Sequence, residues 1–221
     1  MLKKYGMACA PLLVAGTLAG VAGSAAAADL RGFASAGPFG VMLFQPCEGK
    51  KVSVRALKVE DATPDGALTA GVDAVRKIML DSGRPLYVEF RGDVAGLAVT
   101  ARQFRRALGT VESCGANAVT PGTRLLAGGD EPPWRFVLTA SGAQLERPGQ
   151  KPVRFPAAAF AQPQKTGTGR VFDAWSPQDG GTIRLELVEQ MCSDGRSETA
   201  YGARATLRYG SQSFEGCAAL Y

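Results

Sequence analysis

Of the five cysteines in the chain, the four that follow residue 28 limit how it can fold: Cys47, Cys114, Cys192 and Cys217. An even number of cysteines in an exported protein predicts disulfides, and four cysteines can pair in three ways. The spacings favour Cys47 with Cys114 and Cys192 with Cys217, because the long interval between the second and third cysteines contains the best domain boundary. No pair has the close spacing of a four-thiolate zinc site. We therefore expect two disulfides, one in each half of the chain.

The N-terminal 28 residues predict the export on which this pairing depends. Lys3 and Lys4 precede an apolar stretch over residues 11–22, which is shorter than the roughly 20 residues of a membrane-spanning helix. Small residues lead up to Ala28, and Asp29 follows. This pattern is typical of a cleaved secretory signal. We expect a mature chain that begins near Asp29, has no transmembrane helix and resides in the periplasm.

The 221 residues include no histidine. This absence excludes Ser-His-Asp and Cys-His catalysis, imidazole metal ligands and a histidine pH switch. Without Lys3 and Lys4, 23 basic and 20 acidic residues remain, so the expected mature chain has a net charge of +3. That small excess argues against a nucleic-acid-binding surface. No phosphate-cradling glycine loop and no nucleophile elbow is present, so we expect no cofactor, no metal and no nucleic-acid partner.

Turn-forming residues divide the chain near residues 116–124. In the first half, strands are predicted over residues 40–45, 51–59, 86–91, 97–100 and 104–111. A helix is predicted over residues 70–81, because Val72, Val75 and Met79 fall on one face. Two strands, a helix and three further strands suit an OB-type five-stranded barrel over residues 29–118.

The second half, residues 119–221, shows strand pairs around turn signals and no comparable helix. The turns are Ser141-Gly142, residues 177–181 and Gly210-Ser211. Along residues 183–188, apolar and charged residues alternate, so one face of that strand is expected to be buried. Repeated strand pairs predict an antiparallel sheet that closes or packs on itself. The expected fold class is mainly β, with two small β-barrel domains, the first OB-like with one helix, each with one disulfide.

Residues 30–115 resemble the C-terminal OB-fold domain of the NlpE family of bacterial envelope proteins. The matching stretches are Arg31-Gly32, residues 44–47 with 49–51, and residues 84–89. Cys114 also falls where that family has a cysteine. The resemblance implies a Cys47–Cys114 disulfide and an envelope role, since NlpE-like proteins are associated with surface and redox sensing, an envelope-stress pathway and copper tolerance. The chain departs from the family in two ways: it lacks the barrel with a Cys-x-x-Cys motif, and it lacks the lipid anchor. The resemblance therefore does not carry copper binding or NlpE-type signalling over to this chain.

Residues 125–221 are similar to a largely uncharacterised family of bacterial envelope proteins, many of them lipoproteins. That family begins with Gly-x-Glu-Pro-Phe-Trp and ends with Cys-x-Asp-Gly-Met-Ser-Asp, a Tyr-Pro and Gly-Cys. Here the sequence reads Gly-Asp-Glu-Pro-Pro-Trp over 129–134, Cys-Ser-Asp-Gly-Arg-Ser-Glu over 192–198, Tyr201-Gly202 and Gly216-Cys217. The shared spacing implies a shared fold. It implies no activity, because none is settled for the family.

Carboxylates in these motifs are candidate site residues. Asp194 and Glu198 form a possible acid/base pair of the kind that glycosidases use, and a turn held by the disulfide is the alternative. Glu131 and Trp134 form a possible ligand cleft, because an aromatic face beside a carboxylate suits cationic or sugar-like groups. The alternative for Trp134 is a residue that caps the barrel core.

Arg102, Arg105 and Arg106 form a basic cluster around Phe104. Such a cluster suits contact with an anionic envelope component, such as lipid or lipopolysaccharide, and a solvated strand face is the alternative. OB-type barrels also bind single-stranded nucleic acid through such clusters, but the export signal argues against that partner.

These observations predict a non-enzymatic periplasmic protein that binds a protein or an envelope component, with envelope-stress or redox sensing as one role. Two alternatives stay open. One is a hydrolase that acts on envelope polymers through Asp194, Glu198 and Glu131, and the other is a lysozyme-inhibitor-like binding module. A cleft that holds the carboxylates together would favour the enzyme. A flat or basic exposed patch would favour the binder.

Overall fold

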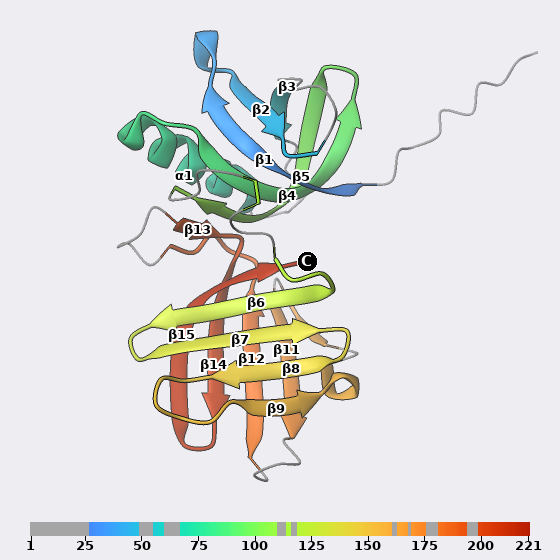
Figure 1. Ribbon diagram of the computed structural model, residues 1–221, viewed down its shortest axis with the longest axis vertical. Helices are drawn as coiled ribbons and strands as arrows, with labels where there is room; N and C mark the ends of the chain where they lie inside the picture. The colour runs from blue at the N-terminus through green and yellow to red at the C-terminus, as the bar shows by residue number, and fades with distance from the viewer. Residues whose placement is uncertain are drawn as a thin grey trace, which may run out of the picture.

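The computed structural model describes residues 27–48, 55–59, 67–109, 114–115, 119–160, 163–167, 169–175, 181–193 and 199–221. Its two parts lie one above the other in Figure 1: a closed five-strand barrel with one helix, and a nine-strand sheet curled into a half-barrel. The expected mainly-β fold class is confirmed. Some of the predicted features lie outside the described residues: the signal up to residue 26, the strand start at residues 51–54, and both Asp194 and Glu198.

The first barrel is closed by its last strand. Its elements are β1 (Ala28–Ala36), the short 3-10 turn η1 (Pro38–Gly40), β2 (Met42–Pro46), β3 (Arg55–Val59), α1 (Ala67–Ser82), β4 (Leu86–Ala95) and β5 (Ala98–Leu108). β1 pairs antiparallel with both β2 and β4, and β2 pairs with β3. β5 pairs antiparallel with β4 and parallel with β3, so the sheet returns on itself.

The predicted order of strands in this half, two before the helix and three after it, was wrong for two reasons. Residues 97–100 and 104–111 were expected as separate strands, but β5 runs continuously from Ala98 to Leu108. β1 was not predicted, so three strands precede the helix and two follow it. The sequence of β1, ADLRGFASA, has mostly small side chains, and only Phe33 and Leu30 are large and apolar. Strand signals that depend on β-branched and aromatic residues are therefore weak there.

The helix prediction is confirmed. α1 covers the barrel with Val72, Val75 and Met79, which are 6%, 2% and 4% exposed. These side chains belong to the same core as Phe44 and Phe90, whose rings meet edge to face with centroids 5.0 Å apart. The spacing of the apolar residues thus places one helical stripe against the sheet.

The second part is one antiparallel sheet of nine strands. They are β6 (Thr123–Asp130), β7 (Pro133–Thr139), β8 (Gly142–Glu146), β9 (Val153–Pro156), β10 (Gln164–Thr166), β11 (Gly169–Trp175), β12 (Thr182–Val188), β14 (Ala203–Tyr209) and β15 (Gln212–Leu220). The order across the sheet is β10-β11-β12-β14-β15-β6-β7-β8-β9. The three hairpins predicted from turn signals, β7–β8, β11–β12 and β14–β15, are all confirmed.

Curling of this sheet creates its own core. In Figure 1, β6 to β9 cross in front of β11, β12, β14 and β15. The 3-10 turn η2 (Ala157–Phe160) inserts the fully buried ring of Phe160 between the layers. That ring lies 5.7 to 6.1 Å, centroid to centroid, from the rings of Phe136, Phe155 and Phe172. Among the described strands, the two ends of the sheet, β9 and β10, do not pair, so the barrel is not closed.

One short strand of the second half belongs to the sheet of the first. β13 (Thr199–Tyr201) pairs antiparallel with the end of β5, with Ala200 opposite Ala107 and Tyr201 opposite Arg106. Ala200 is 1% exposed and lies in the core of the first barrel. The two parts therefore share a sheet. A division of the chain at residue 119 assigns β13 to the second part, although β13 pairs with a strand of the first.

The disulfides pair as predicted, Cys47 with Cys114 and Cys192 with Cys217, each with a Cα–Cα distance of 5.5 Å. Cys192 also exchanges two backbone hydrogen bonds with Tyr201, of 2.9 and 2.8 Å. The second disulfide thus fixes the base of β13 to β15. None of the described helices is both long enough and apolar enough to cross a membrane.

Candidate binding pocket

A pocket of about 470 Å³ opens where the β6–β7 hairpin meets β15 and the base of β13. It brings together the two motifs of the second half, which lie at opposite ends of that half in the sequence. The lining residues are Leu126, Ala127, Gly128, Gly129, Asp130, Glu131, Trp134, Arg135, Cys192, Ser193, Tyr201, Arg204, Glu215, Gly216 and Cys217. The second disulfide therefore forms part of its wall.

Glycines allow the strands at this corner to approach closely. A Cβ on Gly216 would meet the backbone of Gly128, and a Cβ on Gly129 would meet the carbonyl oxygen of Glu215. Any side chain at these two positions would force β15 and β6 apart. Gly129 and Gly216 are thus explained by packing.

Trp134 supports the corner instead of offering an open stacking surface. Its side chain is 4% exposed, and its indole Nε1 donates a 3.0 Å hydrogen bond to the carbonyl oxygen of Glu215. Its ring lies 6.3 Å from that of Phe214, centroid to centroid. This placement matches the alternative in which Trp134 caps the core, although its edge still lines the pocket.

Charges of both signs surround the pocket. Asp130, Glu131 and Glu215 are exposed acidic residues, and Arg135 and Arg204 are exposed basic ones. The guanidinium of Arg135 also makes a 3.2 Å ion pair with Glu146 on β8. The pocket thus combines an apolar floor with a rim of mixed charge.

The loop with Asp194 and Glu198 lies outside the described residues, but its two ends do not. Ser193 and Tyr201 both line the pocket. The hydroxyl of Ser193 donates a 3.0 Å hydrogen bond to the carbonyl oxygen of Thr199, which joins the two ends of the loop. The loop therefore starts and finishes at the same pocket as Glu131.

The structure does not place the three arginines of the first half in one exposed cluster. Arg105 and Arg106 are 5% and 6% exposed. Only Arg102 lies largely in solvent, where it pairs with Asp93. The reason is tertiary: β13 pairs with the end of β5 and β15 packs nearby, so this end of β5 is covered by the second part.

A buried polar cluster lies between the two parts instead. Arg106 donates hydrogen bonds of 2.7 and 2.9 Å to the carboxylate of Glu89. The hydroxyls of Tyr87 and Tyr221 donate to the same carboxylate at 2.9 and 2.7 Å. The guanidinium of Arg105 lies 4.8 Å from the centroid of the Tyr221 ring. Glu89 therefore connects the first barrel to the end of β15.

The ionisation of this cluster follows from its geometry. Burial raises the pKa of Glu89, but the hydrogen bonds and charge of Arg106, with hydrogen bonds from Tyr221 and Tyr87, hold it below its ordinary value. Burial raises the pKa of both tyrosines, so each stays a protonated donor at neutral pH. Glu89 was not among the candidate site residues predicted from the sequence. Its signal in the sequence is a single acidic residue inside the apolar stretch LYVEF.

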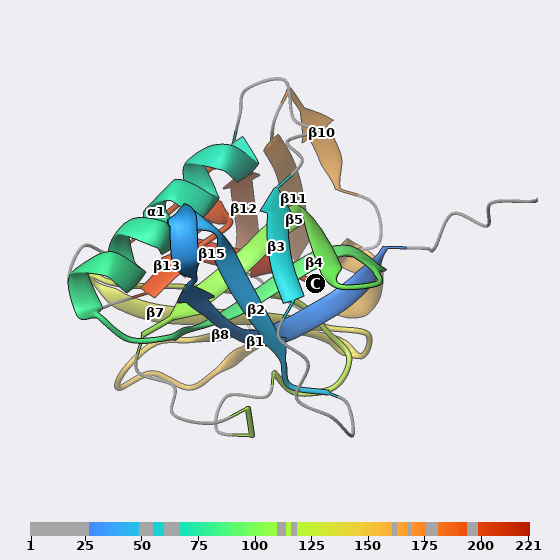
Figure 2. The same ribbon diagram turned by 90° about the horizontal axis from the view of Figure 1, so that it is seen from above.

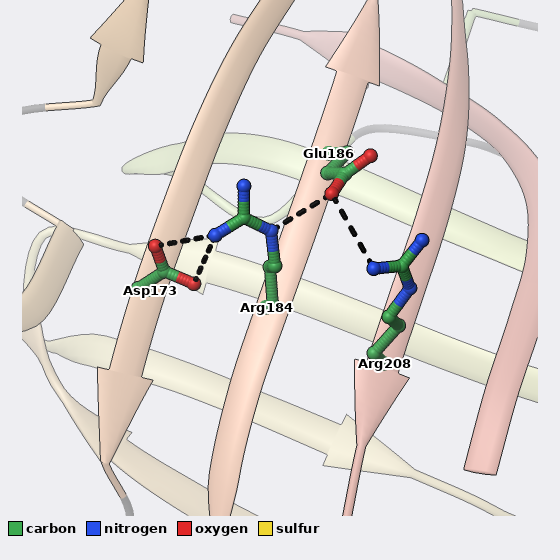
Figure 3. A network of polar contacts seen from close by, with 4 residues as sticks. All are labelled: Asp173, Arg184, Glu186 and Arg208. Atoms are coloured by element: carbon green, nitrogen blue, oxygen red, sulfur yellow. Dashed lines mark hydrogen bonds and ion pairs between the residues drawn. The ribbon is translucent and has the colours of Figure 1, made fainter. Parts of the chain in front are cut away.

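Figure 3 shows a second set of charges, on the outer face of the curled sheet. Arg184 bonds to Glu186 at 2.8 Å and to Asp173 at 3.1 Å, and Arg208 lies 4.0 Å from Glu186. The hydrogen bond that Arg184 donates to Glu186, followed by the charge of Asp173, raises the pKa of Arg184. Exposed pairs of this kind contribute little to stability. We interpret them as a solvated sheet face.

Comparison of the chain with protein-family models, curated proteins and solved structures finds no match. Within the described ranges, no group of three or more Cys, Asp or Glu side chains is placed to hold a metal ion.

Proposed function

We propose that this protein is a non-enzymatic binding protein of the cell envelope and that the pocket beside Cys192–Cys217 is its binding site. The observation that supports this proposal is the meeting of residues 128–135 and residues 192–217 around one pocket. A concave site of several hundred Å³ with a few convergent polar groups is the usual form of a ligand site.

The rim of the pocket suits a ligand that carries both signs of charge. Glu131 and Arg204 can contact an amino group and a carboxylate of the same ligand. A peptide segment of a partner protein has this chemistry, and so does an envelope polymer that carries short peptides.

Exposure of the carboxylates favours binding over hydrolysis. Acid/base catalysis by two carboxyl groups depends on burial that keeps one of them protonated. Asp130, Glu131 and Glu215 are all exposed. The hydrolase is therefore the second candidate, and it rests on Asp194 and Glu198 in the loop whose ends meet the pocket.

The compartment and the wider role belong to the same proposal. Two disulfides and the predicted signal support an oxidising compartment, the periplasm. The strand order of the first barrel, with α1 between β3 and β4, supports an OB-type barrel and the NlpE-like assignment. Envelope-stress or redox sensing would then be the process that ligand binding serves.

A pair of arginine variants on one strand tests the site. Arg204 lines the pocket, whereas Arg208 lies four residues further along the same face of β14, outside this pocket. Immobilised protein is incubated with periplasmic extract and with soluble fragments of peptidoglycan. We expect capture by the unaltered chain and by Arg208→Ala, and reduced capture by Arg204→Ala. Equal capture by both variants would reject the pocket as the site.

Two assays separate the alternatives from the binding protein. Incubation with purified peptidoglycan, followed by chromatography of released fragments, tests the hydrolase. Release that Glu131→Gln abolishes would replace the binding proposal with the enzyme. Lytic activity of lysozyme in the presence of the protein tests the inhibitor, and dose-dependent loss of lysis would identify the partner as a lysozyme.

A further inference from the structure

Exposed large apolar side chains concentrate on two hairpin ends of the first barrel. Six such side chains occur in the described part of the chain. Four of them lie at these ends: Phe39 and Val41 between β1 and β2, Val94 near the end of β4, and Leu97 between β4 and β5. We call these two hairpin ends the apolar tips. Single exposed apolar residues are common on protein surfaces, but four on two hairpin ends of one barrel form a pattern.

Phe39 is held in solvent by a defined turn. Its side chain is 102% exposed, and its backbone has φ 58° and ψ 27°. This left-handed region is unfavourable for a residue with a bulky side chain. Gly37 donates to the carbonyl oxygen of Val41 at 2.7 Å, and Val41 donates to that of Pro38 at 3.2 Å. The turn thus stabilises a conformation that keeps the ring away from the barrel.

Leu97 is presented in a similar way on the other tip. It is 80% exposed, and it follows Gly96, which adopts a positive φ of 56°. Its carbonyl oxygen accepts a 2.9 Å hydrogen bond from the backbone of Ala56 on β3. This bond fixes the tip to the barrel, so Leu97 also projects from a supported turn.

Both tips lack charge and point toward the same end of the molecule. Residues 32–47 and 94–101 contain no charged side chain. Basic residues occur on the adjoining strands: Lys58 is exposed and faces Thr100 across the β3–β5 pair, and Arg102, which pairs with Asp93, follows on β5. Figures 1 and 2 place the two tips at the end remote from the second part, and the strand register puts them beyond opposite ends of β3. One flat surface can therefore meet both.

We propose that the two apolar tips insert into the interfacial region of a phospholipid bilayer and dock the protein on an anionic membrane surface. Protruding apolar side chains on uncharged turns suit a bilayer, which accepts them without a complementary pocket. Aromatic rings are favourable at the level of the lipid headgroups. Lys58, an exposed basic residue on β3 between the tips, can approach anionic headgroups. The pocket beside Cys192–Cys217 lies elsewhere, so this site is independent of the ligand proposed above.

Sedimentation with vesicles of phosphatidylethanolamine and phosphatidylglycerol tests the proposal. We expect the purified chain to bind these vesicles and to bind less to vesicles of phosphatidylcholine alone. Phe39→Gly should lower the partition coefficient by about tenfold, since it removes one phenyl side chain from the interface. Leu97→Ser should lower it as well. Leu80→Ser, at a 66% exposed site on α1 outside the tips, is the matched control and should leave it unchanged.

Phe39→Gly also separates lost binding from lost folding. Glycine adopts φ 58° without strain, so the thermal midpoint of this variant should equal or exceed that of the unaltered chain. Absence of vesicle binding, or unchanged binding by Phe39→Gly, would overturn the proposal. A dimer in light scattering that Phe39→Gly abolishes, without vesicle binding, would do the same, because the tips would then be a contact between two copies.

Discussion

Glu89 and Arg106 depend on each other because both are removed from water. Their side chains are 6% and 7% exposed, and two hydrogen bonds join them. A buried ion pair adds little compared with apolar residues of the same size, but removing one partner leaves an uncompensated charge. Replacing either residue alone is therefore expected to destabilise the fold where the two parts meet.

The first prediction concerns pH. The pKa of Glu89 is lowered in the folded chain, so its ionised form stabilises the fold above the ordinary carboxyl pKa of about 4.3. That contribution is lost as the pH falls below this value toward the folded pKa. Thermal midpoints measured from pH 6 to pH 3 should fall less steeply for Glu89→Gln than for the unaltered chain. If the thermal midpoints of the two proteins fall in parallel with pH, the ionised form of Glu89 does not stabilise the fold.

Glu89→Gln should also unfold more easily at neutral pH. It leaves Arg106 buried without its counter-charge, which costs about 3–5 kcal/mol. Asp93→Asn is a suitable control, because Asp93 pairs with Arg102 on the surface. Its effect on urea denaturation should stay within about 1 kcal/mol.

At the scale of elements, α1 and β13 show two ways of completing the first barrel. α1 covers the core with a stripe that follows from the spacing of its apolar residues. β13 comes from the other half, and Cys192–Cys217 holds it by its base. The packing of α1 therefore follows from its own sequence, whereas the position of β13 depends on a covalent link.

The helix gives the second prediction. Val75→Asp places a charge at a 2% exposed position, which should cost several kcal/mol. Leu80→Asp, on the exposed side of the same helix, should change the free energy of unfolding by less than about 1 kcal/mol. Equal effects in urea denaturation would show that α1 does not pack as described.

The third prediction compares the two disulfides. Replacing Cys192 and Cys217 by serine opens a loop of 25 residues, and replacing Cys47 and Cys114 opens one of 67. Loop entropy gives losses of about 3.5 and 4.4 kcal/mol. Only the first pair of substitutions should also speed amide exchange in β13 and in its partner residues on β5. If both pairs of substitutions speed amide exchange in β13 equally, the Cys192–Cys217 disulfide does not hold β13 in place.

For the whole molecule, the shared strand and the Glu89 cluster join the two parts, so we expect them to unfold as one cooperative unit. Tyr221 reaches Glu89 from β15, and Gly202 donates a 2.7 Å backbone hydrogen bond to Arg105. Packing at Gly202 is close, because a Cβ there would meet the carbonyl oxygen of Phe104. Coupling between the parts thus depends on contacts that neither part contains alone.

The fourth prediction tests that coupling. Gly202→Ala should push β13 away from β5, so a single calorimetric unfolding transition should split into two. Gly115→Ala, where an added Cβ meets nothing within 4 Å, is the control and should keep one transition. A single transition in both variants would show that the parts are coupled without this strand.

The sequence by itself determined the features that depend on local patterns. The hairpins follow from turn residues between alternating strands, the buried face of α1 from apolar spacing, and the pairing of cysteines from the interval between the halves. It also indicated both motifs that meet at the pocket. These predictions succeeded because turn geometry and side-chain periodicity act over a few residues.

Only the tertiary structure decided what depends on partners distant in the chain. β1 has weak local signals and is a strand because β2 and β4 pair with it. Arg105 and Arg106 look like surface residues in the sequence, but β13 and Tyr221 cover them. Burial is a property of the assembled fold: a residue leaves water only when another segment arrives, and no pattern within its own strand records which segment that is.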